Sequence, residues 1–235
     1  MKRIVNGFWL LCIAVVFFSS CNDDFSQPVD QDRIYTIYEL YYNQSADETR
    51  ARVTFKFGNS AGTLMELNEK ASIVFQPQNE SSEYELAFRA DVAIYEKVFD
   101  GLLSAGTFRF TDADGDMYTN NISMTPVNLP DSLAPLTKGQ AWNLTWQGES
   151  LAEHESISLT FNSVDGESSE TFYQGSEGSS QFALSPDQTG LIKKGNNMLI
   201  LDRRYQPETI NAPSAGGALI GRYRPEGRQI QVIDE

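Results

Sequence analysis

The sequence predicts an all-β protein in which two antiparallel β-sandwiches follow one another along the chain. Many short segments alternate apolar and polar residues, turn residues separate them at regular spacing, and no long stretch has the periodicity of a helix. The 235 residues also leave room for two cores of about 100 residues each. These observations together favour sandwiches in tandem.

The strands expected in the first half have one apolar face. In segment 52–57, the side chains of Val53, Phe55 and Phe57 lie on one side and polar side chains lie on the other. Segment 34–42 is aromatic and β-branched throughout, which is typical of a strand covered on both faces. The expected strands are 34–42, 52–57, 83–89 and 107–111.

Segment 91–100 hints at a helix, but its β-branched residues fit a strand equally well. A proline cluster at Pro126, Pro130 and Pro135 then marks the boundary between the two halves. Strands resume beyond this boundary, separated by turns rich in serine, glutamate and glycine. The expected strands of the second half are 141–146, 157–161, 182–184, 198–201, 219–220 and 230–232.

The number and spacing of these strands resemble those of Ig-like domains. The resemblance implies one Ig-like sandwich over residues 33–128 and a second over residues 129–235. Residues 1–20 have the features of a secretory signal peptide, with a basic start, an apolar run and two small serines. The apolar run, residues 8–18, is shorter than the roughly 20 residues of a membrane-spanning helix, so we expect cleavage.

The residue after the two serines is a cysteine, and Phe18-Ser19-Ser20-Cys21 resembles a bacterial lipobox. Strict lipoboxes have leucine where this chain has Phe18, and the looser form resembles that of Bacteroidetes-type lipoproteins. The resemblance implies that Cys21 is lipidated, that residues 21–32 form a tether, and that the protein is anchored in the outer membrane. Asn22-Asp23-Asp24 resembles the acidic signal that exports such lipoproteins to the cell surface. The alternative is an ordinary signal peptide, which would release a secreted protein.

Composition excludes several classes of site. The chain has two cysteines, Cys12 inside the signal and Cys21, so the mature body has no thiol for a disulfide framework, a cysteine nucleophile or a zinc–thiolate site. The net charge of −14 argues against nucleic acid as a partner, because nucleic-acid binders need a basic patch. It also argues against docking on anionic lipid.

The densest group of acids is Asp112, Asp114 and Asp116, in the segment Asp112-Ala113-Asp114-Gly115-Asp116. Three alternating carboxylates could ligate calcium, although the glycine and the closing acid of an EF-hand loop are not in place. The alternative is a hairpin with Asp114-Gly115 as a two-residue turn, and the sequence favours this interpretation. Beyond this weak calcium candidate, we expect no metal and no cofactor.

Trp142, Leu144 and Trp146 share one face of an expected strand. Two exposed tryptophans would form a platform for stacking on sugar rings. The polar residues between them favour the alternative, in which both tryptophans face inward as core anchors.

His154 is the single histidine, flanked by Glu153 and Glu155, and could act as a general base oriented by either acid. Residues adjacent on a strand point apart, and no nucleophile motif accompanies the histidine, so we favour a solvated loop histidine. No pair of carboxylates stands out for glycosidase chemistry.

Two basic segments stand out in the acidic second half, Arg203-Arg204-Tyr205 and Arg222-Tyr223-Arg224. On neighbouring strands they could bind an anionic sugar or a carboxylate. The alternative is that they pair with nearby acids and cover apolar surface with their stems.

These observations predict a lipid-anchored, non-enzymatic binding or structural module, with a glycan, a host protein or an envelope protein as the candidate partner. A pilus-like or adhesin subunit that assembles by strand addition is the first alternative, with residues 22–32 as a donor segment. An envelope hydrolase is the second alternative.

Overall fold

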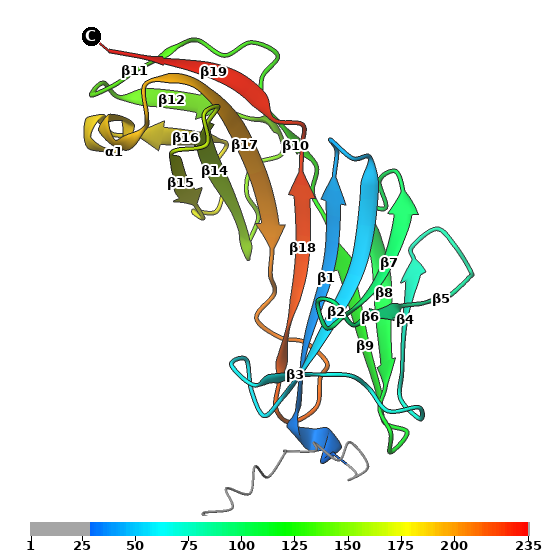
Figure 1. Cartoon of the computed structure of the whole chain (residues 1–235). Coiled ribbons are helices and arrows are strands. Elements are labelled where there is room, and N and C mark those ends of the chain that lie inside the picture. The colour runs from blue at the N-terminus through cyan, green and yellow to red at the C-terminus, as the bar shows by residue number, and fades with distance from the viewer. Residues whose placement is uncertain (1–28, 235) are drawn as a thin grey trace, which may run out of the picture.

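The computed structural model describes residues 29–234 of the chain (Figure 1). The signal segment 1–20 and Cys21 lie outside the described residues. The predicted all-β class is confirmed, because nearly every regular element is a strand. Residues 29–234 also contain one α-helix, α1 (Pro186–Leu191), which was not predicted from the sequence. Ser185 and Gln188 form a capping box at its start.

The first sandwich consists of two sheets that face each other across an aromatic core. One sheet has the order β6-β7-β2-β1-β18, with β3 beside β2, and the other has the order β5-β4-β8-β9. A short 3₁₀ turn, η1 (Gln31–Arg33), precedes the first strand. The strands are β1 (Ile34–Asn43), β2 (Glu48–Phe57), β3 (Thr63–Met65), β4 (Ser72–Pro77), β5 (Tyr84–Glu85), β6 (Ala87–Arg89), β7 (Ile94–Asp100), β8 (Ala105–Thr111), β9 (Met117–Ser123) and β18 (Gly217–Arg224).

Alternation of apolar residues produces the core of the first sandwich. Phe55 of β2 and Phe110 of β8 approach to 4.8 Å between ring centroids, and Tyr38 of β1 and Phe108 of β8 approach to 5.5 Å, so rings from both sheets interlock. The uncertain segment 91–100 is resolved as a strand, β7, which pairs antiparallel with β2. The segment forms a strand because it pairs with β2, and its β-branched residues favour that conformation over a helix.

The second sandwich is built more loosely. Its main sheet contains β15, β14, β17, β19 and β11, and two small sheets, β12–β16 and β10–β13, complete it. The strands are β10 (Val127–Asn128), β11 (Leu136–Thr137), β12 (Trp142–Thr145), β13 (Gln147–Gly148), β14 (Glu155–Ser163), β15 (Ser169–Gln174), β16 (Gln181–Leu184), β17 (Gly195–Tyr205) and β19 (Arg228–Ile233).

Strand pairing crosses the boundary predicted between residues 128 and 129. Strand β18 lies beyond that boundary in sequence, yet it pairs in parallel with β1 of the first sandwich, from Thr36↔Gly217 to Asn43↔Arg224. Strand β17 pairs with β19 at its start and with β18 at its end. One sheet of eleven strands therefore runs through both sandwiches.

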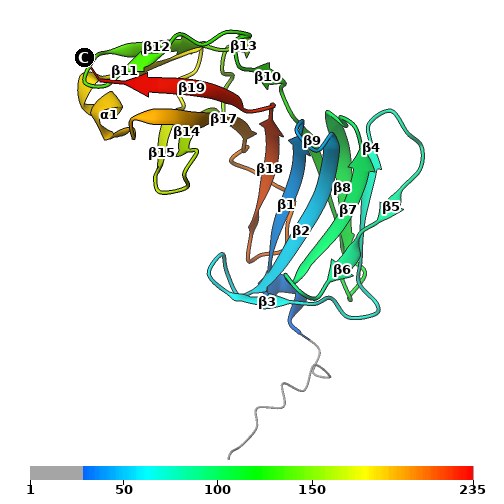
Figure 2. The same ribbon diagram turned by 45° about the horizontal axis from the view of Figure 1, so that its top comes forward.

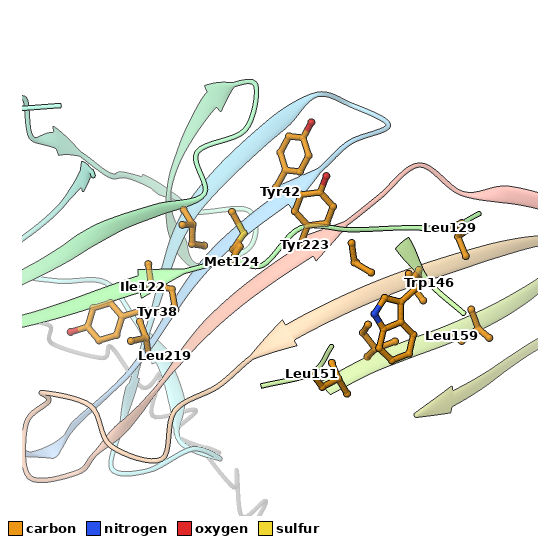
Figure 3. Packing of buried hydrophobic residues seen from close by; sticks show 14 of the residues in the cluster. Tyr38, Tyr42, Ile122, Met124, Leu129, Trp146, Leu151, Leu159, Leu219 and Tyr223 are labelled. Carbon is orange, nitrogen blue, oxygen red and sulfur yellow. The ribbon is translucent and has the colours of Figure 1, made fainter. Parts of the chain in front are cut away.

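The chain passes between the two sandwiches three times: after β9, between β17 and β18, and between β18 and β19. Figure 2 shows β17 and β19 running from the second sandwich toward β18 in the first. The buried apolar side chains of both sandwiches belong to one cluster, which continues through Met124 and Leu129 at the junction (Figure 3). The first described residues, at η1, lie at the end of the first sandwich opposite the second sandwich (Figure 1).

Candidate functional site

The acids Asp112, Asp114 and Asp116 lie in the hairpin between β8 and β9. Asp112 is buried, and its Oδ1 accepts hydrogen bonds from the backbone N–H groups of Asp114 and Asp116, both at 2.9 Å. The Gly115 N–H donates to the Asp112 carbonyl, and Gly115 has a φ of +95°. The predicted hairpin is confirmed, but its turn is centred on Ala113 and Asp114, with Gly115 as the left-handed residue that follows.

Asp112 thus caps backbone donors instead of joining two other carboxylates around an ion. Within residues 29–234, no group of three or more His, Cys, Asp or Glu side chains is arranged to hold a metal ion. Asp112, Asp114 and Asp116 therefore do not form such a group, and the second carboxylate oxygen of Asp112, Oδ2, is buried without a hydrogen-bond partner in this part of the chain.

The two tryptophans of β12 and its continuation serve the core of the second sandwich. Trp146 is buried and lies 5.9 Å from the ring of Phe182, and its indole N–H donates to the Glu149 carbonyl at 3.1 Å. Trp142 is half-buried and lies 5.9 Å from the ring of Phe161. Both rings pack against core phenylalanines. This is the inward-facing arrangement that the polar residues between the tryptophans indicated.

His154 lies on the surface, in a turn closed by the Glu155 N–H and the Ala152 carbonyl. Its φ of +63° is a left-handed conformation, which strains a non-glycine residue. In the described residues, its imidazole has one recorded side-chain neighbour, Glu153 at 3.6 Å. Glu155 points into the protein and pairs elsewhere, so the two acids are not arranged as orienters of a base.

Three of the four arginines in the two basic segments pair with carboxylates. This agrees with the interpretation that they pair with nearby acids, rather than with the one in which they bind an anionic ligand. Arg222 and Arg224 both reach Asp202 Oδ2 at 2.7 Å, and Arg222 also reaches Glu39 at 3.1 Å. Burial lowers the pKa of Arg222, but these two carboxylates outweigh burial, and the pKa lies above its ordinary value. Arg204 donates to the side chain of Gln206 instead.

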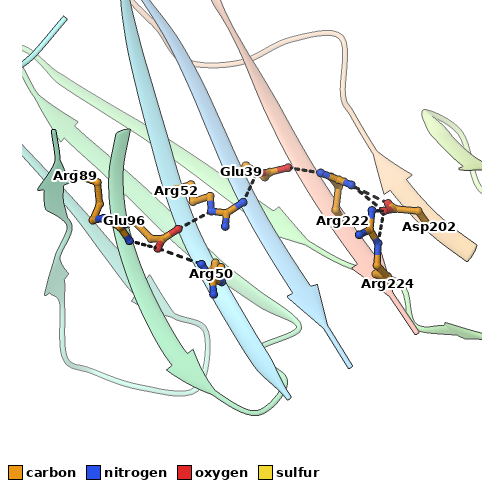
Figure 4. Close-up of polar contacts among 8 residues, drawn as sticks. All are labelled: Glu39, Arg50, Arg52, Arg89, Glu96, Asp202, Arg222 and Arg224. Carbon is orange, nitrogen blue, oxygen red and sulfur yellow. Dashed lines mark hydrogen bonds and ion pairs between the residues drawn. The ribbon is translucent and has the colours of Figure 1, made fainter. Parts of the chain in front are cut away.

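This cluster continues across the outer face of the first sandwich as a row that we call the outer ladder (Figure 4). From Glu39 the row passes to Arg52 at 3.5 Å and then to Glu96 at 2.7 Å, and these residues are direct cross-strand partners. Charges of opposite sign at facing positions stabilise a sheet. The ladder comprises Glu39, Arg50, Arg52, Arg89, Glu96, Asp202, Arg222 and Arg224.

Tyr41 lies under the ladder and explains why β1 is covered on both faces. The guanidinium groups of Arg222, Arg52 and Arg224 lie 4.9, 5.6 and 5.6 Å from its ring centroid. Cations at this distance from a ring face are attracted by its quadrupole. At Tyr41, therefore, arginine side chains cover the outer face of β1, where the sequence suggested a second apolar layer.

Arg203 takes no part in the ladder and is buried at the junction between the sandwiches. Its Nε lies 3.2 Å from Glu155 Oε1, its Nη2 also bonds the same carboxylate, and it donates to the carbonyls of Glu149 and Ser150 at 2.8 and 2.9 Å. Glu155 accepts two further bonds, from Thr125 Oγ1 at 2.7 Å and from the Ala152 N–H at 2.8 Å. We call Arg203 and Glu155 the junction pair.

The junction pair is electrostatically well matched. Burial raises the pKa of Glu155, but the hydrogen bonds from Arg203, Ala152 and Thr125 outweigh burial and hold the pKa below its ordinary value. Thr125 belongs to the segment that leaves the first sandwich, so this bond ties the connection to the second sandwich. A buried ion pair needs hydrogen bonds to offset its desolvation, and here Arg203 donates four while Glu155 accepts two more from Thr125 and Ala152.

A recess of about 280 Å³ opens beside the junction. Three of its eight lining residues belong to β8 and three to β9. The other two are Gln78, which follows β4, and Tyr205, the last residue of β17. None of the eight carries a charge. We call this the junction recess, and its lining residues are Gln78, Ala105, Gly106, Thr107, Asn121, Ile122, Ser123 and Tyr205.

Sequence reasoning found the arginines but missed their partners Glu39, Glu96 and Asp202. These acids are single polar residues within strands, and only the register between strands brings them beside the arginines. The junction recess was missed for the same reason, because Gln78 and Tyr205 are far apart in sequence. Opposite charges on the polar faces of neighbouring strands were the only available signal.

No protein-family model matches the chain, and no curated protein matches it. Solved structures with a similar arrangement include a cytokine receptor complex, with 9% identity, a TM-score of 0.31, and coverage of 83% of this chain and 95% of that chain. The FN1–FN3 domains of chicken CNTN1 are 9% identical, with a TM-score of 0.27 and coverage of 81% of this chain and 63% of that chain. A tetra-tandem repeat from the extending region of a large adhesion protein is 15% identical, with a TM-score of 0.24 and coverage of 84% of this chain and 49% of that chain. Likenesses this weak support no conclusion about the function of this chain.

A search of residues 29–234 for a helix long and apolar enough to cross a membrane finds none.

Proposed function

We propose that this protein is a lipid-anchored, non-enzymatic module of the bacterial outer membrane, in which two rigidly joined sandwiches present a binding surface away from the lipid. The observation that carries the proposal is the junction. Three passages of the chain, one shared sheet, one continuous core and the junction pair all connect the second sandwich to the end of the first opposite η1.

The proposed anchor and the fold together define an orientation. Cys21 precedes Val29 by eight residues, so an extended tether spans at most about 28 Å. The η1 end therefore stays near the membrane. The Gln31 side chain fastens η1 to the β8–β9 hairpin, because its Oε1 accepts a hydrogen bond from the Ala113 N–H. The second sandwich lies at the far end, where surface loops meet partners in the medium.

Mass spectrometry of the native full chain, together with fluorescence on membranes, tests this proposal. We expect an N-terminal peptide that begins at a diacylglyceryl-modified Cys21. In reconstituted vesicles that contain a headgroup acceptor, a donor dye at Ser169→Cys in the second sandwich should be quenched less than one at Asp114→Cys near η1. An unmodified thiol at Cys21, or equal quenching at the two sites, would overturn the proposal.

A second candidate function, assembly by strand addition, is favoured by one specific observation. Strand β15 has six residues and, within residues 29–234, pairs with β14 alone, so its other edge is open in this part of the chain. It contains no lysine, arginine or proline, the residues that commonly protect an edge. The long strand β9 differs, because Asn120 bonds both the N–H and the carbonyl of Asn211 in the covering loop, at 2.8 Å each.

Antiparallel pairing of β15 with β15 of a second copy, centred on Phe172, would place Glu170 opposite Gln174 and Thr171 opposite Tyr173, with no like charges facing each other. Sedimentation of the full chain tests this candidate. Dimers that dissociate in Tyr173→Lys, but persist in Thr119→Lys on β9, would support it. A concentration-independent monomer would exclude it.

A further inference from the structure

The junction recess differs from the rest of this acidic surface in its chemistry. Charged residues make up 21% of the chain, yet the eight residues around the recess include none. A site for an anion or a cation would need a counter-charge, which this lining does not supply. The recess therefore suits a neutral ligand.

The recess also carries polar groups whose hydrogen-bonding capacity is unused. Asn121 Oδ1 accepts from Thr107 Oγ1 at 2.8 Å, which orients the amide and leaves both Nδ2 hydrogens available. Among the described residues, no hydrogen bond engages the side chains of Gln78, Ser123 or Tyr205. Two amides and two hydroxyl groups therefore surround a small volume and can each both donate and accept.

Tyr205 adds an aromatic ring to this polar set. The side chain is half-buried and packs partly against the core, and its backbone pairs with Gly221 of β18. An aromatic ring beside convergent amides and hydroxyls matches a ligand with an apolar C–H face and several hydroxyl groups at its rim. Uncharged sugar rings have this combination.

The position of the recess makes it preformed. Tyr205 follows the junction pair residue Arg203 by two positions, and the other lining residues come mostly from β8 and β9 of the first sandwich. The recess exists only because the end of β17 is held beside β9, where Gly221 also brings β18 close to the Ser123 carbonyl. Ligand sites occur preferentially at such domain interfaces, and a rigid junction removes the cost of ordering one.

We infer that the junction recess binds one uncharged sugar unit, with Tyr205 as the stacking ring and Asn121 and Gln78 as hydrogen-bonding partners. This inference rests on the proposed binding role and names its ligand class. The volume of about 280 Å³ lies at the lower end of ordinary ligand pockets, so a single small unit fits better than a long chain. The unit can be a free sugar or the end of a glycan.

Saturation-transfer NMR with the full chain in detergent tests the inference. The probes are methyl glycosides of glucose, galactose, mannose and N-acetylglucosamine, with glucuronic acid as the charged comparison and a matching oligosaccharide to separate free sugar from a glycan end. We expect transfer to at least one neutral glycoside and none to glucuronic acid. Asn121→Ala, at an exposed position, should weaken binding about tenfold, and Tyr205→Ala should abolish it.

Two controls separate stacking from folding. Tyr205→Phe keeps the ring and should retain binding, whereas Tyr173→Ala removes an aromatic side chain that is 78% exposed and lies outside the recess, and should change nothing. Binding that survives both Tyr205→Ala and Asn121→Ala would overturn the inference, as would transfer to none of the neutral probes. Neither result would alter the membrane-quenching experiment, which tests the proposed function independently.

Discussion

The outer ladder and the junction pair use the same chemistry in two different environments. In the ladder, arginines with 25–50% of their side chains exposed line up across the face of the first sandwich. In the junction pair, the side chains of Arg203 and Glu155 are 2% and 3% exposed. In the ladder Glu96 and Asp202 are 4% and 10% exposed, but solvent reaches their arginine partners, whereas it hardly reaches either member of the junction pair. The pair with both members buried should therefore matter more than each ladder pair.

The comparison also shows where the fold needs specificity. Seven of the eight ladder residues cover a sheet that its aromatic core already holds together, and the eighth, Asp202, reaches them from β17 of the second sandwich. The junction pair lies where the chain changes sandwich three times, and Arg203 there also donates to the carbonyl groups of Glu149 and Ser150. The ion pair with both partners buried lies where the two sandwiches must keep a defined relation.

The largest effect is expected from Arg203→Ala. The substitution leaves the buried Glu155 carboxylate without its charged partner and removes one donor from each of the Glu149 and Ser150 carbonyls, which should reduce the free energy of unfolding by about 3–5 kcal/mol. Urea denaturation measures the change. In the double variant E155L/R203M, apolar side chains replace both charges, and we expect it to recover much of the loss. A loss under about 1 kcal/mol for Arg203→Ala would contradict the account of the junction.

Gly221→Ala should come next, with a loss of about 1–3 kcal/mol. A Cβ atom at this position would lie 2.4 Å from the Ser123 carbonyl oxygen, so β18 and β9 would have to separate. The matched control is Gly190→Ala in α1, where a Cβ meets nothing within 4 Å and alanine favours the helix. Thermal unfolding should show a lower Tm for the first variant and an equal or higher Tm for the second.

Glu96→Gln should have a smaller effect, about 1 kcal/mol. Glu96 pairs with Arg50, Arg52 and Arg89, but these guanidinium groups keep contact with water after the charge is removed. The difference from the native chain should shrink as salt is raised to about 1 M, because screening weakens exposed pairs. A loss that is as large as that of Arg203→Ala, or independent of salt, would show that burial does not separate the two regions.

The smallest effect is expected in the pH dependence of unfolding. Because the folded-state pKa of Glu155 is lowered, its stabilising contribution is fully present above the unfolded-state pKa of about 4.3 and is lost as pH falls through the folded-state value. Glu155→Gln should therefore show a shallower loss of stability below about pH 4.3 than the native chain. Equal slopes in urea titrations across this range would argue against the shift.

Sequence patterning accounted for β1, β2 and β8 of the first sandwich and for the inward tryptophans, since alternation decides which side chains face the core. It did not predict β4, and the expected strand 83–89 was wrong, because the chain there crosses from one sheet to the other as β5 and β6. It also identified Arg203, Arg222 and Arg224 as a group. Their partners depend on register, and the decisive pairing joins Thr36 to Gly217, a contact that no local pattern encodes. The same parallel pairing brings β18 back to the first sandwich, which a division at a proline cluster does not anticipate.

The turn at Asp112 shows a second limit of reasoning from sequence. Alternating acids next to a glycine are compatible with a calcium loop and with a hairpin, and the choice depends on where the carboxylates point. In this chain, Asp112 turns back on its own backbone. Local N–H donors satisfy Oδ1, as is common for a short acidic side chain in a turn, whereas the buried Oδ2 has no hydrogen-bond partner among the described residues.

A distance distribution between the two sandwiches tests the central claim most directly. Spin labels at Asp114→Cys and Ser169→Cys in the lipidated full chain would report it by pulsed electron resonance, with Cys21 blocked by its lipid. The account predicts a single narrow distribution that stays narrow without ligand and broadens in Arg203→Ala. A broad or bimodal distribution in the native chain would show that the sandwiches move independently, and would contradict the account.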